Sequence, residues 1–258
     1  MLTDTHTHLT LPTYNADREE VIARAQAEGV RRLVVIGLDL ASSRAAVALA
    51  ECQENLWATV GVHPHEAAAL DEETLEALTE LAAHPKVVAW GEIGLDYYRH
   101  RTPRKVQREA FRRQLARARA VGRPVVVHDR EAHEEVFALL EEAEAWARGG
   151  VMHCFSGDRA LAERYLARGF YIGLDGPVTF PKASRLHDLA AHLPLNALLL
   201  ETDCPYLTPH PYRGRRNEPA YLRYIAERVA QLRGLTVEAV AEVTSANAVR
   251  LFGWSSLA

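Results

Sequence analysis

Histidine and carboxylate side chains stand at short spacings along this chain of 258 residues. The first such pair is His6 and His8, which a single threonine separates. Residues two apart on a β-strand face the same side, roughly 6.5 Å from each other, so both imidazoles could approach one metal ion. Imidazole with carboxylate suits zinc, manganese, iron or nickel, and carboxylate-rich sites also suit magnesium. The pair alone is ambiguous, because two partly exposed histidines around Thr7 explain it equally well.

Short apolar runs alternate with longer amphipathic stretches, and these predict the elements that would position such residues. Strands are expected at Leu2–Leu9, Arg32–Leu38, Trp57–His63, Val87–Ile93, Pro124–His128, Gly150–Phe155, Phe170–Leu174 and Ala197–Asp203. Helices are expected at Arg18–Glu28, Ala41–Glu54, Glu73–Ala82, Arg104–Val121, Glu134–Arg148, Arg159–Ala167, Lys182–Ala191, Pro219–Leu232 and Val237–Phe252.

Strands that alternate with helices pair in parallel through right-handed crossovers. The expected strand interiors are nearly continuous in Val, Ile and Leu, as in buried parallel strands. No Gly-x-Gly-x-x-Gly follows the first strand, which argues against a dinucleotide-binding fold. About eight such units in 258 residues predict an α/β protein with a single (β/α)8 TIM-type barrel, and no linker divides residues 1–258, so we expect one domain.

In such barrels the active site lies at the carboxyl ends of the strands. Several histidines and carboxylates fall near those ends, namely His6, His8, His63, His65, Glu92, His128, His153, Glu201 and Asp203. One such placement is weak evidence, but this many together indicate a metal site. Alternatives remain for single residues: Glu92 could form a buried salt bridge, although an unpaired charge among apolar neighbours is costly. Asp203 could cap a helix, although Pro205 disfavours that role.

Seven motifs along the chain are similar to those of the TatD family of metal-dependent deoxyribonucleases, within the amidohydrolase-like barrels. They are Asp4-Thr5-His6-Thr7-His8-Leu9, Gly61-Val62-His63-Pro64-His65, Gly91-Glu92-Ile93-Gly94-Leu95-Asp96-Tyr97, Val127-His128-Asp129-Arg130, His153-Cys154-Phe155-Ser156-Gly157, Glu201-Thr202-Asp203-Cys204-Pro205 and Arg216-Asn217-Glu218-Pro219. Each motif is modest by itself, but their order over the whole length is specific.

The resemblance implies two adjacent divalent ions, which could be Mg, Mn or Zn. The ligands of the first ion would be His6, His8, Glu92 and Asp203. The ligands of the second would be Glu92, His128 and His153, so that Glu92 bridges the two ions. The resemblance also implies that His65 lies near the substrate phosphate, and that the protein is a 3′-to-5′ exonuclease acting on DNA, on single strands or strand ends.

Phosphodiester hydrolysis at a two-metal site assigns roles to these residues. Asp203 is the candidate to accept a proton from the attacking water, although a ligand's low pKa makes it a poor base. His65 and Arg130 could contact the non-bridging phosphate oxygens. For Arg130, a surface ion pair with Glu134 is an equally good explanation.

The net charge of −4 argues against a protein that grips long nucleic acid by its backbone. Two expected loops are nevertheless rich in cations, and could form a positive collar for a strand end. They carry Arg99, His100, Arg101 and Arg104 after the fourth strand, and His210, Arg213, Arg215 and Arg216 after the eighth. Tyr97, Tyr98 and Tyr212 could stack on bases, although packing contacts are the commoner fate of such side chains.

Other functions fit the same residues. The alternatives are a hydrolase of small amides, lactones or phosphate esters, a metal-binding scaffold without turnover, and a nucleic-acid-binding module. The start of the chain lacks the pattern of a signal peptide, and no apolar run reaches about 20 residues. We therefore expect a cytoplasmic protein with no membrane association and no obligate protein partner.

Overall fold

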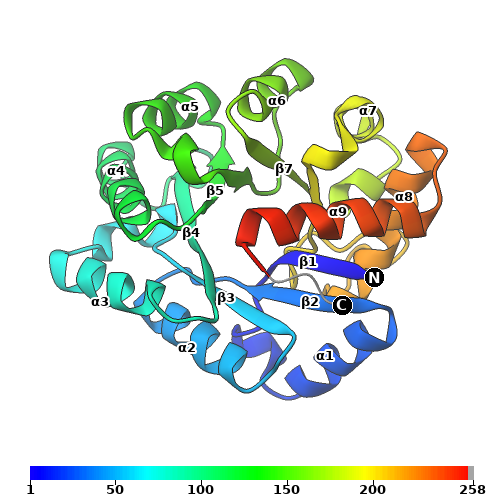
Figure 1. The fold of residues 1–258 in the computed structure, drawn as a ribbon, viewed down its shortest axis with the longest axis horizontal. Helices are drawn as coiled ribbons and strands as arrows, with labels where there is room; N and C mark the ends of the chain where they lie inside the picture. Colours follow the sequence, from blue (N-terminus) through cyan, green and yellow to red (C-terminus); the bar gives the residue numbers. More distant parts are fainter. Residues whose placement is uncertain (255–258) are drawn as a thin grey trace.

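A computed structural model describes residues 1–254 of the chain. Eight parallel strands form one sheet in sequence order, from β1 to β8 (Figure 1). The strands are β1 (Leu2–Thr7), β2 (Val30–Val35), β3 (Leu56–Val60), β4 (Val87–Asp96), β5 (Val125–Arg130), β6 (Gly150–Met152), β7 (Phe170–Leu174) and β8 (Leu198–Leu200). The predicted (β/α)8 barrel is therefore confirmed. The last four positions of the expected domain 1–258 lie outside the described residues.

Helices surround the barrel and alternate with the strands (Figure 1). They are α1 (Arg18–Ala27), α2 (Leu40–Glu51), α3 (Glu72–Ala82), α4 (Arg104–Val121), α5 (His133–Glu142), α6 (Arg159–Leu166), α7 (Ser184–His192), α8 (Leu222–Arg233) and α9 (Val237–Phe252). The helices bury apolar side chains in a core that they share with the strands, as the amphipathic patterns predict. None of the helices described between residues 1 and 254 is long and apolar enough to cross a bilayer.

The barrel closes where β1 meets the segment after β8. The amide of His8 donates to the carbonyl of Cys204 at 2.9 Å, and the amide of Asp203 donates to the carbonyl of His6 at 3.0 Å. A parallel bridge joins Thr7 and Cys204. Two expected ligand segments, from opposite ends of the chain, are thus hydrogen-bonded neighbours.

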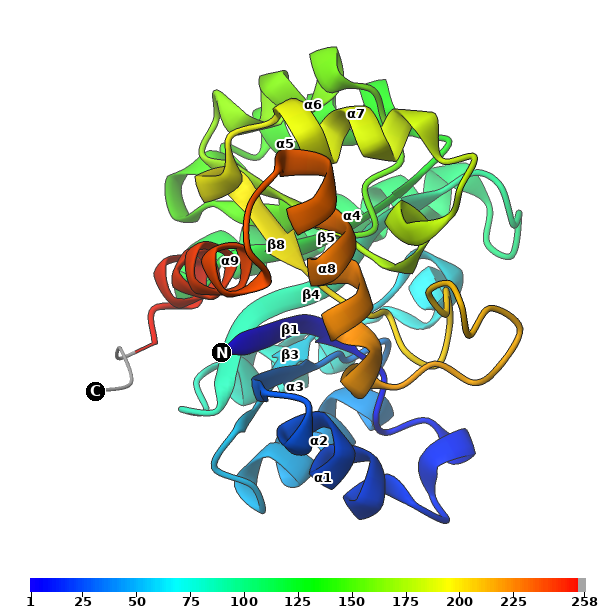
Figure 2. The same ribbon diagram turned by 90° about the vertical axis from the view of Figure 1, so that its right-hand side faces the viewer.

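The last helix, α9, lies across the end of the barrel at which β1 begins (Figures 1 and 2). Ser245 in α9 donates to the carbonyl of Met1 at 3.1 Å, and Asn247 donates to the carbonyl of Leu198 at 2.7 Å. The loops after β4 and β8 project from the other side, on the right of Figure 2. Because α9 covers the amino end, the carboxyl ends of the strands are the open face of the barrel.

Three of the expected element boundaries were wrong, and the local backbone or strand pairing shows where each element ends. The strand expected to end at Ile93 continues to Asp96, because Gly94 and the two residues after it pair with β5. The strand expected to reach Asp203 stops at Leu200, and Asp203 adopts a left-handed backbone conformation with φ of 54°. The helix expected to reach Arg148 ends at Glu142, and the left-handed residue Glu144 (φ 49°) separates it from a short 3-10 turn.

Candidate metal centre

The structure brings all six predicted metal ligands together at the open end of the barrel. They are His6, His8, Glu92, His128, His153 and Asp203. Glu92 lies in β4 and His128 in β5, while His8, His153 and Asp203 stand just beyond the strands that lead to them. Parallel strands end at the same edge of the sheet, which is why residues up to 197 positions apart meet here.

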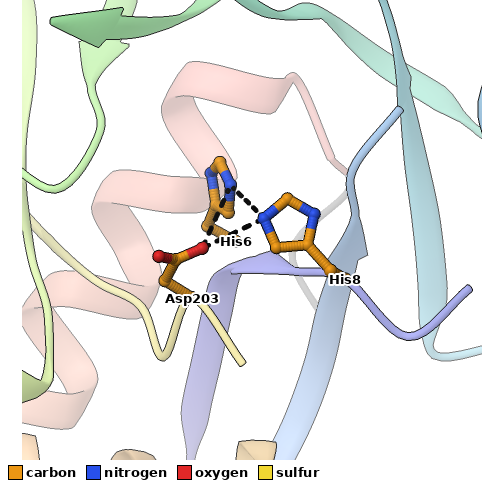
Figure 3. Close-up of side chains that lie close together, drawn as sticks. All are labelled: His6, His8 and Asp203. Atoms are coloured by element: carbon orange, nitrogen blue, oxygen red, sulfur yellow. Dashed lines mark hydrogen bonds and ion pairs between the residues drawn. The ribbon is translucent and has the colours of Figure 1, made fainter. Parts of the chain in front are cut away.

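The first group of candidate ligands consists of His6, His8 and Asp203 (Figure 3). The Nε2 atoms of His6 and His8 lie 3.3 Å apart, and His8 Nε2 lies 3.0 Å from Asp203 Oδ1. His6 Nε2 is 3.8 Å from the same oxygen. The two imidazoles thus present the same nitrogen to one point, as the spacing of His6 and His8 predicts.

Glu92 connects this group with a second one. Its Oε2 atom lies 3.3 Å from His6 Nε2. Its Oε1 atom lies 2.8 Å from His128 Nδ1 and 3.7 Å from His63 Nε2. One buried carboxylate therefore faces two histidine groups with its two oxygens.

His153 takes its orientation from Glu201. Glu201 Oε1 lies 2.9 Å from His153 Nδ1 and accepts a hydrogen bond of 2.6 Å from the amide of Cys154. The other ring nitrogen, Nε2, then faces Glu92 Oε1 and Asp203 Oδ1, each at 3.9 Å. A carboxylate on the far nitrogen of a ligating histidine is a common way to fix its tautomer and direction.

Asp96 has the corresponding place on the other side of the centre. Its Oδ2 atom lies 2.9 Å from His65 Nε2 and 3.2 Å from His128 Nε2. Both nitrogens of His128 therefore face carboxylates. His65 stands at the rim beside this pair, with its ring centre 4.4 Å from that of His63.

Buried side chains hold the backbone of the ligand segments. Asp4 accepts hydrogen bonds from the amides of His6 and Thr202 at 3.3 and 3.0 Å. Asn217, which is fully buried, donates to the carbonyl of Thr202 at 2.8 Å and to that of Tyr206 at 2.6 Å. These contacts stabilise the left-handed conformation of Asp203, which is unfavourable for a residue with a Cβ atom.

The cluster balances buried negative and positive charge. Burial raises the pKa of Glu92, but the imidazoles of His63 and His6 outweigh it and hold this pKa well below its usual range. Burial lowers the pKa of His153, yet Glu201 raises it to about 10. In the same way, Asp96 and Glu92 overcome burial and raise the pKa of His128 to about 9.

Divalent cations fit this donor set. Bonds of about 2.0–2.1 Å to a tetrahedral zinc ion separate the ligand atoms by about 3.3–3.4 Å. The distances from His6 Nε2 to His8 Nε2 and to Glu92 Oε2 are both 3.3 Å. Without a cation, two buried imidazole nitrogens would face each other directly. The mixture of imidazole and carboxylate also admits manganese or, with more oxygen ligands, magnesium.

The expected collar of cations is only partly available to a substrate. Arg130, which was predicted outside this collar, is exposed, and its guanidinium lies 4.1 Å from the ring centre of Tyr98. The alternative ion pair of Arg130 with Glu134 is not formed, because Glu134 pairs with Arg164. Arg216 is taken up by an ion pair with Asp17 at 2.6 Å. Other predicted members lie over aromatic rings, namely Arg104 over Tyr97, Arg213 over Phe180 and Arg215 over Tyr212.

Of the tyrosines predicted to stack on bases, Tyr97 is buried and Tyr212 stacks on Tyr221.

The predicted ligand list omitted His63, Asp96 and Glu201. The sequence carried a signal for each of them. His63 and Glu201 stand two positions before His65 and Asp203, so alternation along a strand would put each pair on one face. Asp96 follows Glu92 by four positions on the same strand, and only the strand boundary drawn at Ile93 concealed it.

A sequence profile described as "TatD related DNase" matches residues 3–253. The chain belongs to this family. As predicted, it is a metal-dependent hydrolase of the TatD type that acts on ester bonds.

Relatives along the whole length agree with this membership. A Bacillus subtilis protein named "Uncharacterized metal-dependent hydrolase YabD" is 46% identical, over 98% of this chain and 99% of its own. The "3'-5' ssDNA/RNA exonuclease TatD" of Escherichia fergusonii is 42% identical, over 98% and 99%. The crystal structure of the TatD homologue YJJV from Escherichia coli superimposes with a TM-score of 0.93 at 32% identity, covering 98% of both chains.

Proposed function

We propose that this TatD family protein is a deoxyribonuclease that removes nucleotides from the 3′ ends of single DNA strands. Two divalent ions would be held, the first by His6, His8, Glu92 and Asp203 and the second by Glu92, His128 and His153, with His63 as a further candidate ligand. The curated relative from Escherichia fergusonii carries the name of a 3′-to-5′ exonuclease on single-stranded DNA and RNA. DNA ends are proposed as the substrate of this chain from that likeness.

The observation that carries the two-ion proposal is the position of Glu92. One of its oxygens lies 3.3 Å from His6 Nε2, and the other lies 2.8 Å from His128 Nδ1. Such a carboxylate can bridge two ions. When bound about 3.5–4 Å apart, a pair of ions lowers the pKa of a shared water and neutralises phosphoryl oxygens.

Side chains of the protein would accept the proton and bind the phosphate. Asp203 would accept the proton of the attacking water, but His8 and His153 hold its pKa low despite burial, which limits it as a base. His65 is partly exposed beside Asp96 and would donate a hydrogen bond to a non-bridging phosphate oxygen. Arg130 would bring its positive charge to the same phosphate or to the next one.

The test is hydrolysis of single-stranded DNA labelled at one end or the other, with Mg²⁺, Mn²⁺ or Zn²⁺ after chelation. We expect loss of nucleotides from the 3′ end only, and no hydrolysis while the chelator is present. No shortening of DNA with any of these ions, together with turnover of a small amide, lactone or phosphate ester, would overturn the proposal.

A further inference from the structure

Two exposed tyrosines border the metal centre. Tyr98 follows β4 and is 48% exposed, and Tyr206 follows β8 and is 53% exposed. The loops that carry them project from the same side of the barrel, away from α9 (Figure 2). A single exposed apolar side chain is ordinary, but two aromatic rings at the rim of one site suggest a common ligand.

Tyr206 is exposed on a backbone that is held in place. Its amide donates to the carbonyl of Asp203 at 2.9 Å, and its carbonyl accepts from Asn217 at 2.6 Å. Its ring stands edge to face with His8, with 6.0 Å between ring centres and 66° between ring planes. The ring is therefore fixed against His8, a member of the first ligand group.

Tyr98 is held in a similar way. Asp96 Oδ1 accepts hydrogen bonds from the amides of Tyr98 and Arg99, at 3.0 and 2.8 Å. The guanidinium of Arg130 covers the ring of Tyr98 at 4.1 Å. An aromatic ring and a cation thus lie together at this side of the centre. A nucleotide needs both, because its base binds to rings and its phosphate binds to cations.

Arg101 adds positive charge to the loop that carries Tyr98. It follows Tyr98 by three positions in the loop after β4. Arg101 is itself exposed. The open face of the barrel therefore carries two aromatic rings, Tyr98 and Tyr206, and exposed arginines beside them. Rings and cations side by side match the alternating bases and phosphates of a single strand.

We propose that Tyr206 stacks on the terminal base of a DNA strand, while Tyr98 and Arg130 hold the next nucleotide. The inference rests on the nuclease function proposed above and assigns the recognition of an unpaired end to these residues. A tyrosine face binds every base, so such contacts select for exposed bases without selecting a sequence. A base inside a duplex has neighbours on both faces and offers no free surface for the ring.

The test is the binding of a hexadeoxynucleotide with fluorescent 2-aminopurine at its 3′ or its 5′ end. Phosphorothioate in the terminal linkages slows hydrolysis, and the full-length protein is loaded with Mg²⁺, which binds sulfur poorly and does not quench fluorescence. We expect quenching of the base at the 3′ end, which Tyr206→Phe retains. Tyr206→Leu should abolish this quenching and weaken binding about tenfold, because stacking on an aromatic ring is lost.

Leu235→Ala is the control, since Leu235 is 44% exposed between α8 and α9 and should leave both readouts unchanged. Tyr98→Leu should weaken binding but keep the quenching at the strand end. Quenching that persists in Tyr206→Leu, or its absence in the unaltered protein, would overturn the inference. Quenching that depends on Tyr206, in a protein that does not shorten ordinary DNA, would support the inference and refute the nuclease function alone.

Discussion

Among the individual residues, Glu92 is a buried carboxylate enclosed by titratable side chains. It is almost completely buried, and imidazoles from β1, β5 and the segment after β3 surround its two oxygens. A buried carboxylate in such a cluster is stable only if positive charge compensates it, either from protonated imidazoles or from cations. Its neighbours Glu201 and Asp96 touch the outer side of the histidines rather than the centre.

Replacing Glu92 with glutamine should remove the proposed bridge while preserving its shape. We expect bound metal to decrease and DNA hydrolysis to fall by more than about 100-fold, since even outer hydrogen-bond partners of ligands are worth 10–100-fold. Metal analysis after gel filtration, together with cleavage of end-labelled DNA, measures both effects. Glu134→Gln, in an exposed ion pair with Arg164, is the matched control. Full metal content and unaltered activity in Glu92→Gln would refute the assignment.

Glu201→Gln tests the orientation of His153. Both hydrogen bonds end on Glu201 Oε1, and the oxygen of a neutral amide accepts more weakly than that of a charged carboxylate. The hold on His153 Nδ1 and on the amide of Cys154 therefore weakens. We expect metal affinity to decrease about 10- to 100-fold, as measured by calorimetric titration of the chelated protein with Mn²⁺. Unchanged affinity would mean that His153 needs no such support.

At the scale of the elements, the ligands depend on loops as much as on strands. β8 contributes only Leu198–Leu200, so Asp203 lies on a segment outside the regular sheet. That segment is fixed from two sides, by the barrel-closing hydrogen bonds to β1 and by the side chain of Asn217. The motif that contains Asn217 therefore has a structural role beside the centre.

Asn217→Ala should leave the buried carbonyl of Thr202 and the partly buried carbonyl of Tyr206 without their donors. We expect the free energy of unfolding to fall by about 2–3 kcal/mol, as measured by urea denaturation. Activity should decrease as well, because Asp203 loses its fixed position. Asn196→Ala, at an exposed asparagine between α7 and β8, is the control and should change stability by less than about 0.5 kcal/mol. Equal stability of the two variants would contradict this role.

For the molecule as a whole, the barrel carries a cluster of titratable groups that a cation should stabilise. A ligand that binds only the folded state adds about 2.7 kcal/mol at 100 times its dissociation constant. For a chain of roughly this size, each kcal/mol corresponds to about 2–4 °C.

Calorimetry should therefore show a midpoint of unfolding roughly 5–10 °C higher with Mn²⁺ or Zn²⁺ than after chelation. The Glu134→Gln protein should keep this increase, and the Glu92→Gln protein should lose most of it. An equal midpoint with and without metal would argue against ions bound in the folded core of the site.

The sequence by itself determined the architecture, and it named six candidate metal ligands that the structure brings together at one end of the barrel. Apolar runs of strand length separated by amphipathic helices allow few arrangements other than a barrel, and Phe170–Leu174, Arg104–Val121 and Val237–Phe252 were predicted with their observed bounds. Since the carboxyl ends of parallel strands share one edge, His6, Glu92 and His128 could be brought together without a structure.

Tertiary structure decided what depends on direction and on long-range contact. Local pattern could not show that β4 continues through Asp96, because pairing with β5 sustains it. It could not show which nitrogen of His153 faces the centre, because Glu201, 48 residues away, fixes the ring. Nor could it distinguish the exposed ring of Tyr206 from the buried ring of Tyr97. Exposure and orientation follow from packing between distant segments, and a linear spacing carries no information about them.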